Sequence, residues 1–316
     1  MTTFSTDPPL VAIVGPTASG KSALGVFLAK EFRGEVVACD STQLYRGFDI
    51  GTAKPTPAER ASVPHHLLDV LDATEDSTAG GYRERALHVL DDLRARSRLP
   101  MFTVGTGLYL RALLEGLADL PLRSEELRDR LRASAVEHGP RHLHAMLERL
   151  DPHAAQQISS ADEQKLIRAI EICLLGRKPL TEIHCAGRTP LTGWRILKLG
   201  LQPEREALYQ RIHNRTAVML QAGWLDEVAS LISSRLPENA KPFNFIGYRE
   251  LRRHLRGEIA LEAACAAIQQ GTRQYAKRQL TWFRREKDVH WLTGFGDNEV
   301  VQSAAREWLT AQFSQD

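Results

Sequence analysis

The first hundred residues alternate short apolar runs with longer stretches of helical periodicity. The runs at 10–14, 35–39 and 101–104 predict buried strands, because each is mainly apolar and ends next to a glycine or an aspartate. Helix-forming stretches at 21–32 and 78–96 separate these runs. Strands that alternate with helices are typical of parallel βαβ units, in which helices cover both faces of a sheet. We therefore expect an α/β core over residues 1–120.

The pattern changes after residue 122, where helical stretches continue without a strand. Asp151 followed by Pro152 predicts a capped helix start, and Asp162 predicts the start of another helix. These signals predict an all-helical insertion domain at 121–189.

A strand-like run returns at 194–199, and helical stretches follow near Pro203 and Trp224. A long helical pattern then runs from 258 to about 287. Residues 190–316 are therefore expected to rejoin the parallel-sheet core and to add a helical C-terminal region.

Composition describes an ordinary globular chain of 316 residues, with 43% apolar and 25% charged residues. No run approaches the ~20 apolar residues of a membrane span, and residues 1–10 do not resemble a secretory signal. We therefore expect no membrane partner. The cysteines form no C-x-x-C pair, so we expect reduced thiols and a cytoplasmic location. The four are Cys39, Cys173, Cys185 and Cys265.

Positive charge is concentrated near the C-terminus, although the net charge is only +2. Between Asn244 and Lys287 there are ten Lys and Arg against four Glu, and the rest of the chain has a slight negative balance. A basic region on an otherwise slightly acidic protein favours a polyanionic partner.

One motif predicts a phosphate site. The segment 15–22 matches G-x-x-x-x-G-K-[ST] and lies between a predicted strand and a predicted helix. Backbone N–H groups of such a loop surround phosphate oxygens, the lysine adds a point charge, and the hydroxyl of Ser22 can hold Mg²⁺. The diphosphate-binding candidates are Gly15, Pro16, Thr17, Ala18, Ser19, Gly20, Lys21 and Ser22.

A P-loop alone fits a kinase, an NTPase or a diphosphate-dependent transferase. The second strand ends at Asp40, which resembles the Mg²⁺-holding aspartate of an NTPase. No N-K-x-D guanine-recognition motif is present. The two patterns leave these alternatives open.

Further motifs distinguish between them. The chain resembles the tRNA dimethylallyltransferases (the tRNA isopentenyltransferase family) over about 270 of its 316 residues. Two departures are Ser22, where the family usually has Thr, and Val104, which replaces the first glycine of G-G-T-G-L-Y. The matching segments, besides the P-loop, are 40–46, 49–55, 64–69, 105–109, 168–171, 246–250 and 277–284.

The resemblance implies transfer of a dimethylallyl group from dimethylallyl diphosphate to N6 of the adenosine 3′ of the anticodon (position 37) in tRNA. It also implies a Mg²⁺ cofactor and a P-loop core with a helical insertion that helps to hold the anticodon stem-loop. Eukaryotic members add a C-terminal zinc finger that this sequence lacks, so the bacterial type is expected. We expect a monomer.

The resemblance also assigns catalytic roles. Asp40 would be the general base that takes a proton from the adenine amine, with Thr106 hydrogen-bonding nearby. Alternatively, Asp40 only ligates Mg²⁺ and Thr106 only caps a helix. Arg211 and Arg215 are spaced by four on a predicted helix, and the resemblance favours Arg215 for the diphosphate; a solvated helix face is the alternative.

The C-terminal helix combines a basic and an apolar face. From Arg273, the positions of Lys277, Arg278, Thr281, Arg284 and Arg285 fall within about 140° of helix surface. A solvated amphipathic helix has the same periodicity, but with the resemblance we expect tRNA contact. The tRNA-binding residues implied by the resemblance are Asp40, Ser41, Thr42, Gln43, Thr106, Arg128, Gln164, Lys165, Leu166, Ile167, Arg168, Asn244, Phe245, Ile246, Gly247, Tyr248, Arg249, Lys277, Arg278, Gln279, Leu280, Thr281, Trp282, Phe283 and Arg284.

Other interpretations remain open. A small-molecule kinase fits the P-loop, and a non-catalytic RNA-binding nucleotide switch fits the basic region. A prenyltransferase that acts on free AMP is a closer alternative, which the tRNA-matched C-terminal helix argues against. The adjacent His65 and His66 lack a third ligand at a suitable position, so a structural or substrate-lining role is expected for them rather than metal binding.

Overall fold

The computed structural model describes residues 7–118, 120–121, 123–185 and 187–314. Residues 1–6, where a secretory signal would begin, and the side chain of Cys185 lie outside this description. The chain forms two compact units. The first comprises the chain up to Leu113 together with the chain from Thr192 onward, and the second is Leu114–Leu191. The helical insertion expected at 121–189 falls within the second unit.

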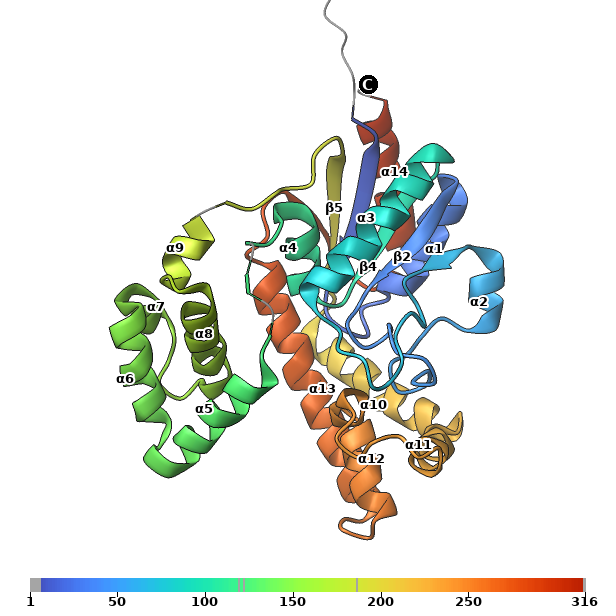
Figure 1. The fold of residues 1–316 in the computed structure, drawn as a ribbon. Helices are drawn as coiled ribbons and strands as arrows, with labels where there is room; N and C mark the ends of the chain where they lie inside the picture. Colours follow the sequence, from blue (N-terminus) through green and yellow to red (C-terminus); the bar gives the residue numbers. More distant parts are fainter. Residues whose placement is uncertain (1–6, 119, 122, 186, 315–316) are drawn as a thin grey trace, which may run out of the picture. The chain divides into compact units, whose positions relative to one another are not determined.

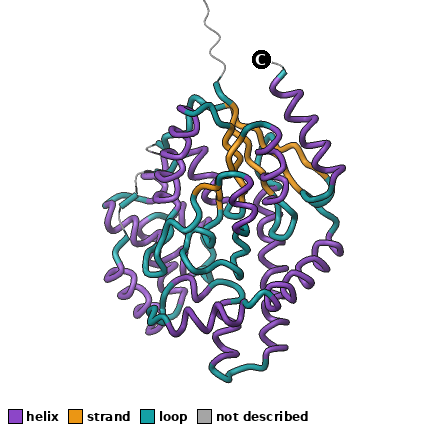
Figure 2. The backbone as a smooth tube through the Cα atoms, turned by 90° about the vertical axis from the view of Figure 1, so that its right-hand side faces the viewer, coloured by secondary structure: helices purple, strands orange, loops and turns teal. Residues whose placement is uncertain are grey.

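The first unit contains a six-stranded sheet in which every pairing is parallel. Its strand order is β3-β2-β4-β1-β5-β6, and the strands lie side by side in Figure 2. The α/β prediction is confirmed. The sequence pattern missed the two edge strands, of two and four residues. The strands are β1 (Pro9–Val14), β2 (Gly34–Cys39), β3 (His65–His66), β4 (Leu99–Val104), β5 (Arg195–Leu201) and β6 (Val289–Leu292).

The central strand β1 is apolar along its length because both of its faces are covered. Alternate side chains point to opposite faces. Val11 and Ile13 belong to a core that also contains side chains of α1 (Lys21–Glu31) and α14 (Glu299–Phe313). The helix α3 (Ala79–Ala95) packs on β4 and begins at Thr78, whose side chain accepts a hydrogen bond from the backbone N–H of Gly81.

The carboxyl ends of three neighbouring strands bring the motif residues to one edge of the sheet. Val14 at the end of β1 is opposite Val104 at the end of β4, which is opposite Cys39 at the end of β2. The P-loop, Asp40 and the 105–106 turn follow directly. Ligands of open α/β sheets bind outside such strand ends. The register therefore assembles the predicted site.

Four helices and a short 3-10 helix complete the described site region of the first unit (Figure 1). The expected continuous helical pattern to about 287 is wrong in its extent, since α13 ends at Phe283 and the chain then enters β6. These elements are α10 (Arg205–Gln221), α11 (Trp224–Ser233), η1 (Lys241–Asn244), α12 (Tyr248–Leu255) and α13 (Leu261–Phe283). Two shorter helices, α2 (Pro57–Ser62) and α4 (Gly107–Glu115), lie between the earlier strands and were not predicted.

The described residues of the second unit form helices and connecting loops, without a strand. Asp151 and Asp162 cap helices as predicted, since their side chains accept hydrogen bonds from the backbone N–H groups of Ala154 and Lys165. Leu143, Leu147, Leu166 and Ile170 lie in its core. Its helices are α5 (Glu125–His138), α6 (Pro140–Leu150), α7 (Pro152–Gln157), α8 (Glu163–Gly176) and α9 (Leu180–Cys185).

Over the described part of the chain, none of the helices has the length and apolar character that crossing a bilayer requires.

Candidate active site

The P-loop holds Lys21, a cation without a carboxylate partner in the part of the chain that the structure describes. The Lys21 ammonium donates hydrogen bonds to the carbonyl oxygens of Gly15 and Pro16, at 2.9 and 2.8 Å. Burial lowers the pKa of Lys21 to about 8, an effect that Asp40 opposes and Arg215 reinforces. The loop borders a cavity of about 520 Å³. An anion bound in this cavity would lie beside the Lys21 ammonium, which is already partly shielded from water.

Arg211 and Arg215 lie one turn apart on α10 and have different surroundings. Arg211 forms a bidentate ion pair with Asp297, with both N–O distances at 2.7 Å. Arg215 is half-buried and forms no ion pair with any carboxylate of the described residues. Burial lowers the pKa of its guanidinium, and Arg211 adds to that effect. Of the two, Arg215 therefore has its charge available for a ligand.

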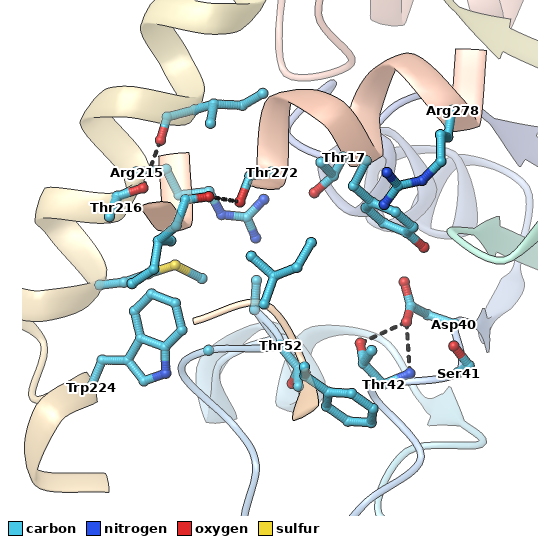
Figure 3. A pocket seen from close by; sticks show the side chains of 18 residues that line it. Thr17, Asp40, Ser41, Thr42, Thr52, Arg215, Thr216, Trp224, Thr272 and Arg278 are labelled. Atoms are coloured by element: carbon cyan, nitrogen blue, oxygen red, sulfur yellow. Dashed lines mark hydrogen bonds between the residues drawn. The ribbon is translucent and has the colours of Figure 1, made fainter. Parts of the chain in front are cut away.

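Asp40 has one carboxylate oxygen occupied and one without a donor. Its Oδ1 accepts hydrogen bonds from the backbone N–H and the hydroxyl of Thr42, at 2.9 and 2.7 Å (Figure 3). Within the described residues, no hydrogen bond reaches Oδ2. This oxygen lies against Gly105, where any Cβ would clash with it. The glycine thus allows the carboxylate to lie across the adjoining strand end.

Thr106 is positioned beside Asp40 through Ser41. Its Oγ1 accepts a hydrogen bond from the Ser41 backbone N–H at 2.9 Å and donates to the Ser41 hydroxyl at 3.2 Å. Thr106 directly precedes α4, which is the position that the helix-capping alternative requires. However, the hydroxyl oxygen is bonded to the 41–42 segment, which it holds beside the aspartate.

A second cavity of about 350 Å³ adjoins the first (Figure 3). Arg215 and Arg278 extend into it from α10 and α13, and Asp40 lies at its wall. Both cavities share five lining residues: Thr17, Asp40, Thr52, Ala53 and Arg215. The apolar part of the second cavity is formed by Ile212, Met219, Trp224, Phe245, Ile246 and Ile268. Asp40 is therefore placed where a cavity lined by the P-loop meets an apolar one.

The segment 41–55 that borders both cavities is held by buried polar contacts. Gln43 donates from Nε2 to the carbonyl oxygens of Thr52 and Ala53, at 3.2 and 3.1 Å. Lys54 is buried and forms ion pairs with Asp49 and Asp69, at 2.7 and 2.5 Å. Gln43 thus shapes the cavity wall from within the protein.

Glu227 is a site-supporting residue that the sequence analysis missed. Its carboxylate on α11 accepts hydrogen bonds from the backbone N–H groups of Asp49 and Ile50, at 3.1 and 2.8 Å. It also accepts from the Tyr248 hydroxyl at 2.6 Å. Nothing in the local sequence marks this glutamate, because its partners lie far away along the chain.

The residues 244–249 have mixed roles in the structure. Phe245 and Ile246 line the apolar cavity. Gly247 has φ of 96° and packs against Trp224 so closely that a Cβ would clash. Tyr248 is fully buried. Asn244 and Arg249 are exposed, so their side chains are available to a partner.

The basic face of α13, defined here as Lys277, Arg278 and Thr281 of the helix together with Arg284 and Arg285 directly after its last residue, is exposed at each position. None of its four cations has a carboxylate within ion-pair distance in the described part of the chain. Arg278 lies 5.7 Å from the centre of the Tyr275 ring.

Other α13 residues expected to contact tRNA are turned inward. Gln279 and Phe283 are buried, and Leu280 is half-buried. Trp282 packs on Gly107, where a Cβ would clash with its indole. These side chains attach the helix to the core and are not presented on its basic face.

The residues of the second unit that were expected to contact tRNA differ in their surroundings. Arg128 and Arg168 form ion pairs with the fully buried Glu171, at 2.8 and 2.6 Å. Burial alone would raise the pKa of Glu171, but hydrogen bonds from both arginines and from the Ser124 N–H lower it to about 2. Leu166 and Ile167 are buried, whereas Gln164 and Lys165 are exposed.

No cluster of three or more His, Cys, Asp or Glu that could hold a metal occurs in the described residues. His66 is bonded to Glu35 at 2.7 Å, and His65 to the carbonyl of Val63 at 2.7 Å. Both histidines thus have structural partners. Ser22 is exposed at the start of α1 and borders the P-loop cavity.

Comparison with known proteins agrees with this site. A family model described as IPP transferase matches residues 43–286. The chain belongs to the IPP transferase family. A model described as isopentenyl transferase matches residues 8–72. The resemblance found in the motifs is confirmed.

Similar IPP transferases are known from sequence and structure. The chain is 52% identical to a tRNA dimethylallyltransferase of Koribacter versatilis, with 95% of this chain and 98% of that protein covered. The fold is similar to the tRNA isopentenylpyrophosphate transferase of Bacillus halodurans, with a TM-score of 0.72, 35% identity and 97% of each chain covered. It is also similar to a eukaryotic dimethylallyltransferase acting on tRNA, with a TM-score of 0.80 and 26% identity over 96% of this chain and 77% of that one.

Proposed function

We propose that this IPP transferase is a tRNA dimethylallyltransferase, which transfers a dimethylallyl group from dimethylallyl diphosphate to N6 of the adenosine 3′ of the anticodon. The proposal rests on one observation: Asp40 lies in the common wall of a cationic cavity and an apolar cavity. Its relatives carry the same activity in their names. Since tRNA is the acceptor and the described Cys39, Cys173 and Cys265 are free, we expect a cytoplasmic enzyme.

The diphosphate is proposed to bind in the cavity beside the P-loop. Backbone N–H groups of Ala18, Gly20, Lys21 and Ser22, together with the Lys21 ammonium and the Arg215 guanidinium, would surround its oxygens. Negative charge grows on diphosphate as the allylic C–O bond breaks, so cations fixed there in advance lower the barrier. The dimethylallyl group would extend toward the apolar cavity, where exclusion of water protects an allylic cation from hydrolysis.

Asp40 is proposed as the general base. The N6 lone pair forms a bond with the first allylic carbon, that carbon loses its bond to the diphosphate oxygen, and the N6 proton moves to Asp40 Oδ2. Oδ2 is suited to this role because the Thr42 hydrogen bonds to Oδ1 orient the carboxylate and leave Oδ2 without a donor. Thr106 positions the Ser41–Thr42 segment that holds the base.

Mg²⁺ fits this site as a partly hydrated ion bound mainly through the substrate. The described chain offers the Ser22 hydroxyl and at most one nearby carboxylate, Asp40, which suits an ion that keeps several waters and binds phosphate oxygens. When bound, Mg²⁺ would neutralise charge on the departing diphosphate.

The anticodon stem-loop is proposed to bind along the basic face of α13, with Asn244 and Arg249 beside it. These cations have no internal carboxylate partners except Arg249, which is bonded to Glu250 at 2.5 Å. Gln164 and Lys165 of the second unit are also candidates for contact. Because the amine of a stacked loop base is inaccessible, we propose that the target adenosine is extruded before transfer.

The direct test is incubation with labelled dimethylallyl diphosphate, Mg²⁺ and unmodified anticodon stem-loops, followed by nucleoside analysis. Label should appear on the adenosine and not on a loop in which guanosine replaces it. Equal labelling of both loops would contradict the proposal, and phosphorylation of a small acceptor without any tRNA dependence would favour the kinase alternative.

The variant Asp40→Asn tests the role of the base. It retains shape and removes basicity, so the single-turnover rate should fall by ~10²- to 10⁴-fold while diphosphate affinity at several Mg²⁺ concentrations stays unchanged. Asp91→Asn, an exposed position on α3, is the matched control. A rate that recovers on raising Mg²⁺ would instead assign Asp40 to the metal.

A further inference from the structure

One face of α13 packs against the turn that follows β4. Tyr275, Gln279 and Trp282 occupy positions i, i+4 and i+7, which lie on the same side of a helix. Tyr275 and Gln279 bond to Gly105, and Trp282 packs on Gly107. This inward face therefore contacts the turn that carries Thr106 and underlies Asp40.

Gln279 also reaches the P-loop. Its Oε1 accepts a hydrogen bond from the backbone N–H of Thr17 at 2.7 Å, and its Nε2 donates to the carbonyl oxygen of Gly105 at 2.7 Å. A backbone donor on one side and a backbone acceptor on the other permit only this orientation of the amide. The side chain is 5% exposed, so the family-based expectation of a tRNA contact does not suit it.

The two backbone groups that Gln279 joins belong to opposite halves of the proposed reaction centre. Thr17 lies in the loop for the donor diphosphate, and Gly105 lies directly against Oδ2 of Asp40. The Gly105 carbonyl also accepts a hydrogen bond from the Tyr275 hydroxyl at 3.2 Å, so α13 occupies both of its lone pairs. A displacement of either group would change the distance between the donor carbon and the acceptor amine.

We propose that Gln279 is a positioning residue, which sets the P-loop and the general base at the separation that transfer requires. The inference rests on the proposed function and goes beyond it, because it assigns a role in the rate to an amide that joins two backbone groups of the site. A reacting centre displaced by about 1 Å can lose ~10²-fold in rate.

The first variant is Gln279→Met, which has similar length and removes both hydrogen bonds. With both substrates saturating, kcat should fall by ~10- to 100-fold, whereas the Kd for the stem-loop should change by less than about twofold. Gln270→Met places the same substitution at an exposed position of α13 and is the matched control. Weakened stem-loop binding with unchanged kcat would indicate that Gln279 contacts the RNA, and it would overturn the proposal.

The second variant, Gln279→Glu, separates positioning from simple loss of structure. The ionised carboxylate still accepts from Thr17 N–H but repels the Gly105 carbonyl, whereas the protonated acid can donate to that carbonyl and restore both hydrogen bonds. Burial and Asp40 raise the pKa of the introduced carboxyl, and the facing cations Lys21 and Arg215 lower it. Tyr275, the other titratable group at this carbonyl, stays neutral at these pH values because burial raises its pKa.

The ratio of the kcat of Gln279→Glu to that of the wild type should therefore rise as the pH falls from 8 to 5.5. Taking the ratio at each pH removes the pH effects that both proteins share. A ratio that does not change with pH, or a loss of kcat that matches the unfolded fraction in thermal denaturation, would overturn the proposal. An inactive wild-type enzyme would instead contradict the proposed function.

Discussion

The second unit and the reaction centre of the first unit both take ionised groups out of water, but they treat them in opposite ways. In the second unit, the buried Glu171 is neutralised by Arg128 and Arg168 and by a backbone N–H. In the first, Lys21 and Arg215 are half-buried, with no carboxylate within ion-pair distance among the described residues.

The difference distinguishes structural charge from functional charge. A buried group with all its partners inside the protein contributes to a fixed fold, and removing one partner leaves the others uncompensated. A buried cation without a counterion keeps a free-energy cost that an anionic ligand can relieve. The first arrangement is complete without a ligand, whereas the second becomes complete only when diphosphate binds.

The largest expected effect is on the stability of the second unit. Glu171→Gln should lower its free energy of unfolding by ~3 to 5 kcal/mol, because two guanidinium groups lose their shared counterion. Urea denaturation followed by hydrogen exchange in Leu114–Leu191 measures the change, with the exposed Glu148→Gln as control. In the wild type, the contribution of Glu171 should be fully present above pH 4.5 and be lost as the pH falls through about 2. If Glu171→Gln and Glu148→Gln change the free energy of unfolding equally, the ion pairs of Glu171 do not stabilise the second unit, and its contrast with the reaction centre is lost.

A change at Arg215 should affect the rate and spare the stability. Arg215→Met removes a half-buried cation that has no ion-pair partner among the described residues, so the unfolding free energy should stay the same or rise, and transfer should slow by ~10²- to 10³-fold. Arg205→Met, at an exposed position on the same helix, controls for the loss of charge. If Arg215→Met is destabilised and its residual folded fraction is fully active, the guanidinium is structural.

The next effect is a pH dependence of ligand binding. The pKa of Lys21 is about 8, so affinity for inorganic diphosphate should fall by up to ~10-fold per pH unit above pH 8 as the ammonium is lost. In the free protein, stability should rise over the interval from pH 8 to 10.5, because the unfolded chain there binds more protons. Isothermal titration at several pH values measures the affinity. Lys21→Arg cannot deprotonate in this range, so an equally steep slope in that variant would assign the effect to the ligand.

The smallest expected effect concerns exposed cations. Arg284→Ala should weaken stem-loop binding and reduce the log–log salt slope by ~0.7 to 0.9, the contribution of one phosphate contact, with turnover unchanged at saturating tRNA. Arg253 is also exposed but is paired with Glu258 at 3.0 Å, so Arg253→Ala should reduce the slope less. Equal slopes for the two variants would show that internal pairing does not decide which exposed cations bind RNA.

Local patterns predicted the parts of the site that depend on neighbours in sequence. The P-loop, the strand before Asp40 and the exposed face of α13 follow from apolar runs, glycine spacing and the 3.6-residue period. The pattern could not separate Arg211 from Arg215, since the deciding partner of Arg211 is Asp297 in a distant loop. For the same reason it missed Glu227 and gave no sign that Gln279 bonds to the P-loop. The two short edge strands carried too few residues for a periodicity to appear.

The contacts that complete the P-loop have a consequence for synthesis of the chain. Gln279 bonds to Thr17 across 262 positions of sequence, and the N–H of Gly296 bonds to the carbonyl of Ser19 at 2.9 Å. The ribosome therefore synthesises Thr17 of the phosphate-binding motif 262 residues before Gln279, one of the groups that fix the geometry of the motif. Contacts this distant in sequence are slow to form. A nascent chain would carry the motif for most of its elongation time before these contacts could form, so diphosphate binding should mature as a late, post-elongation event.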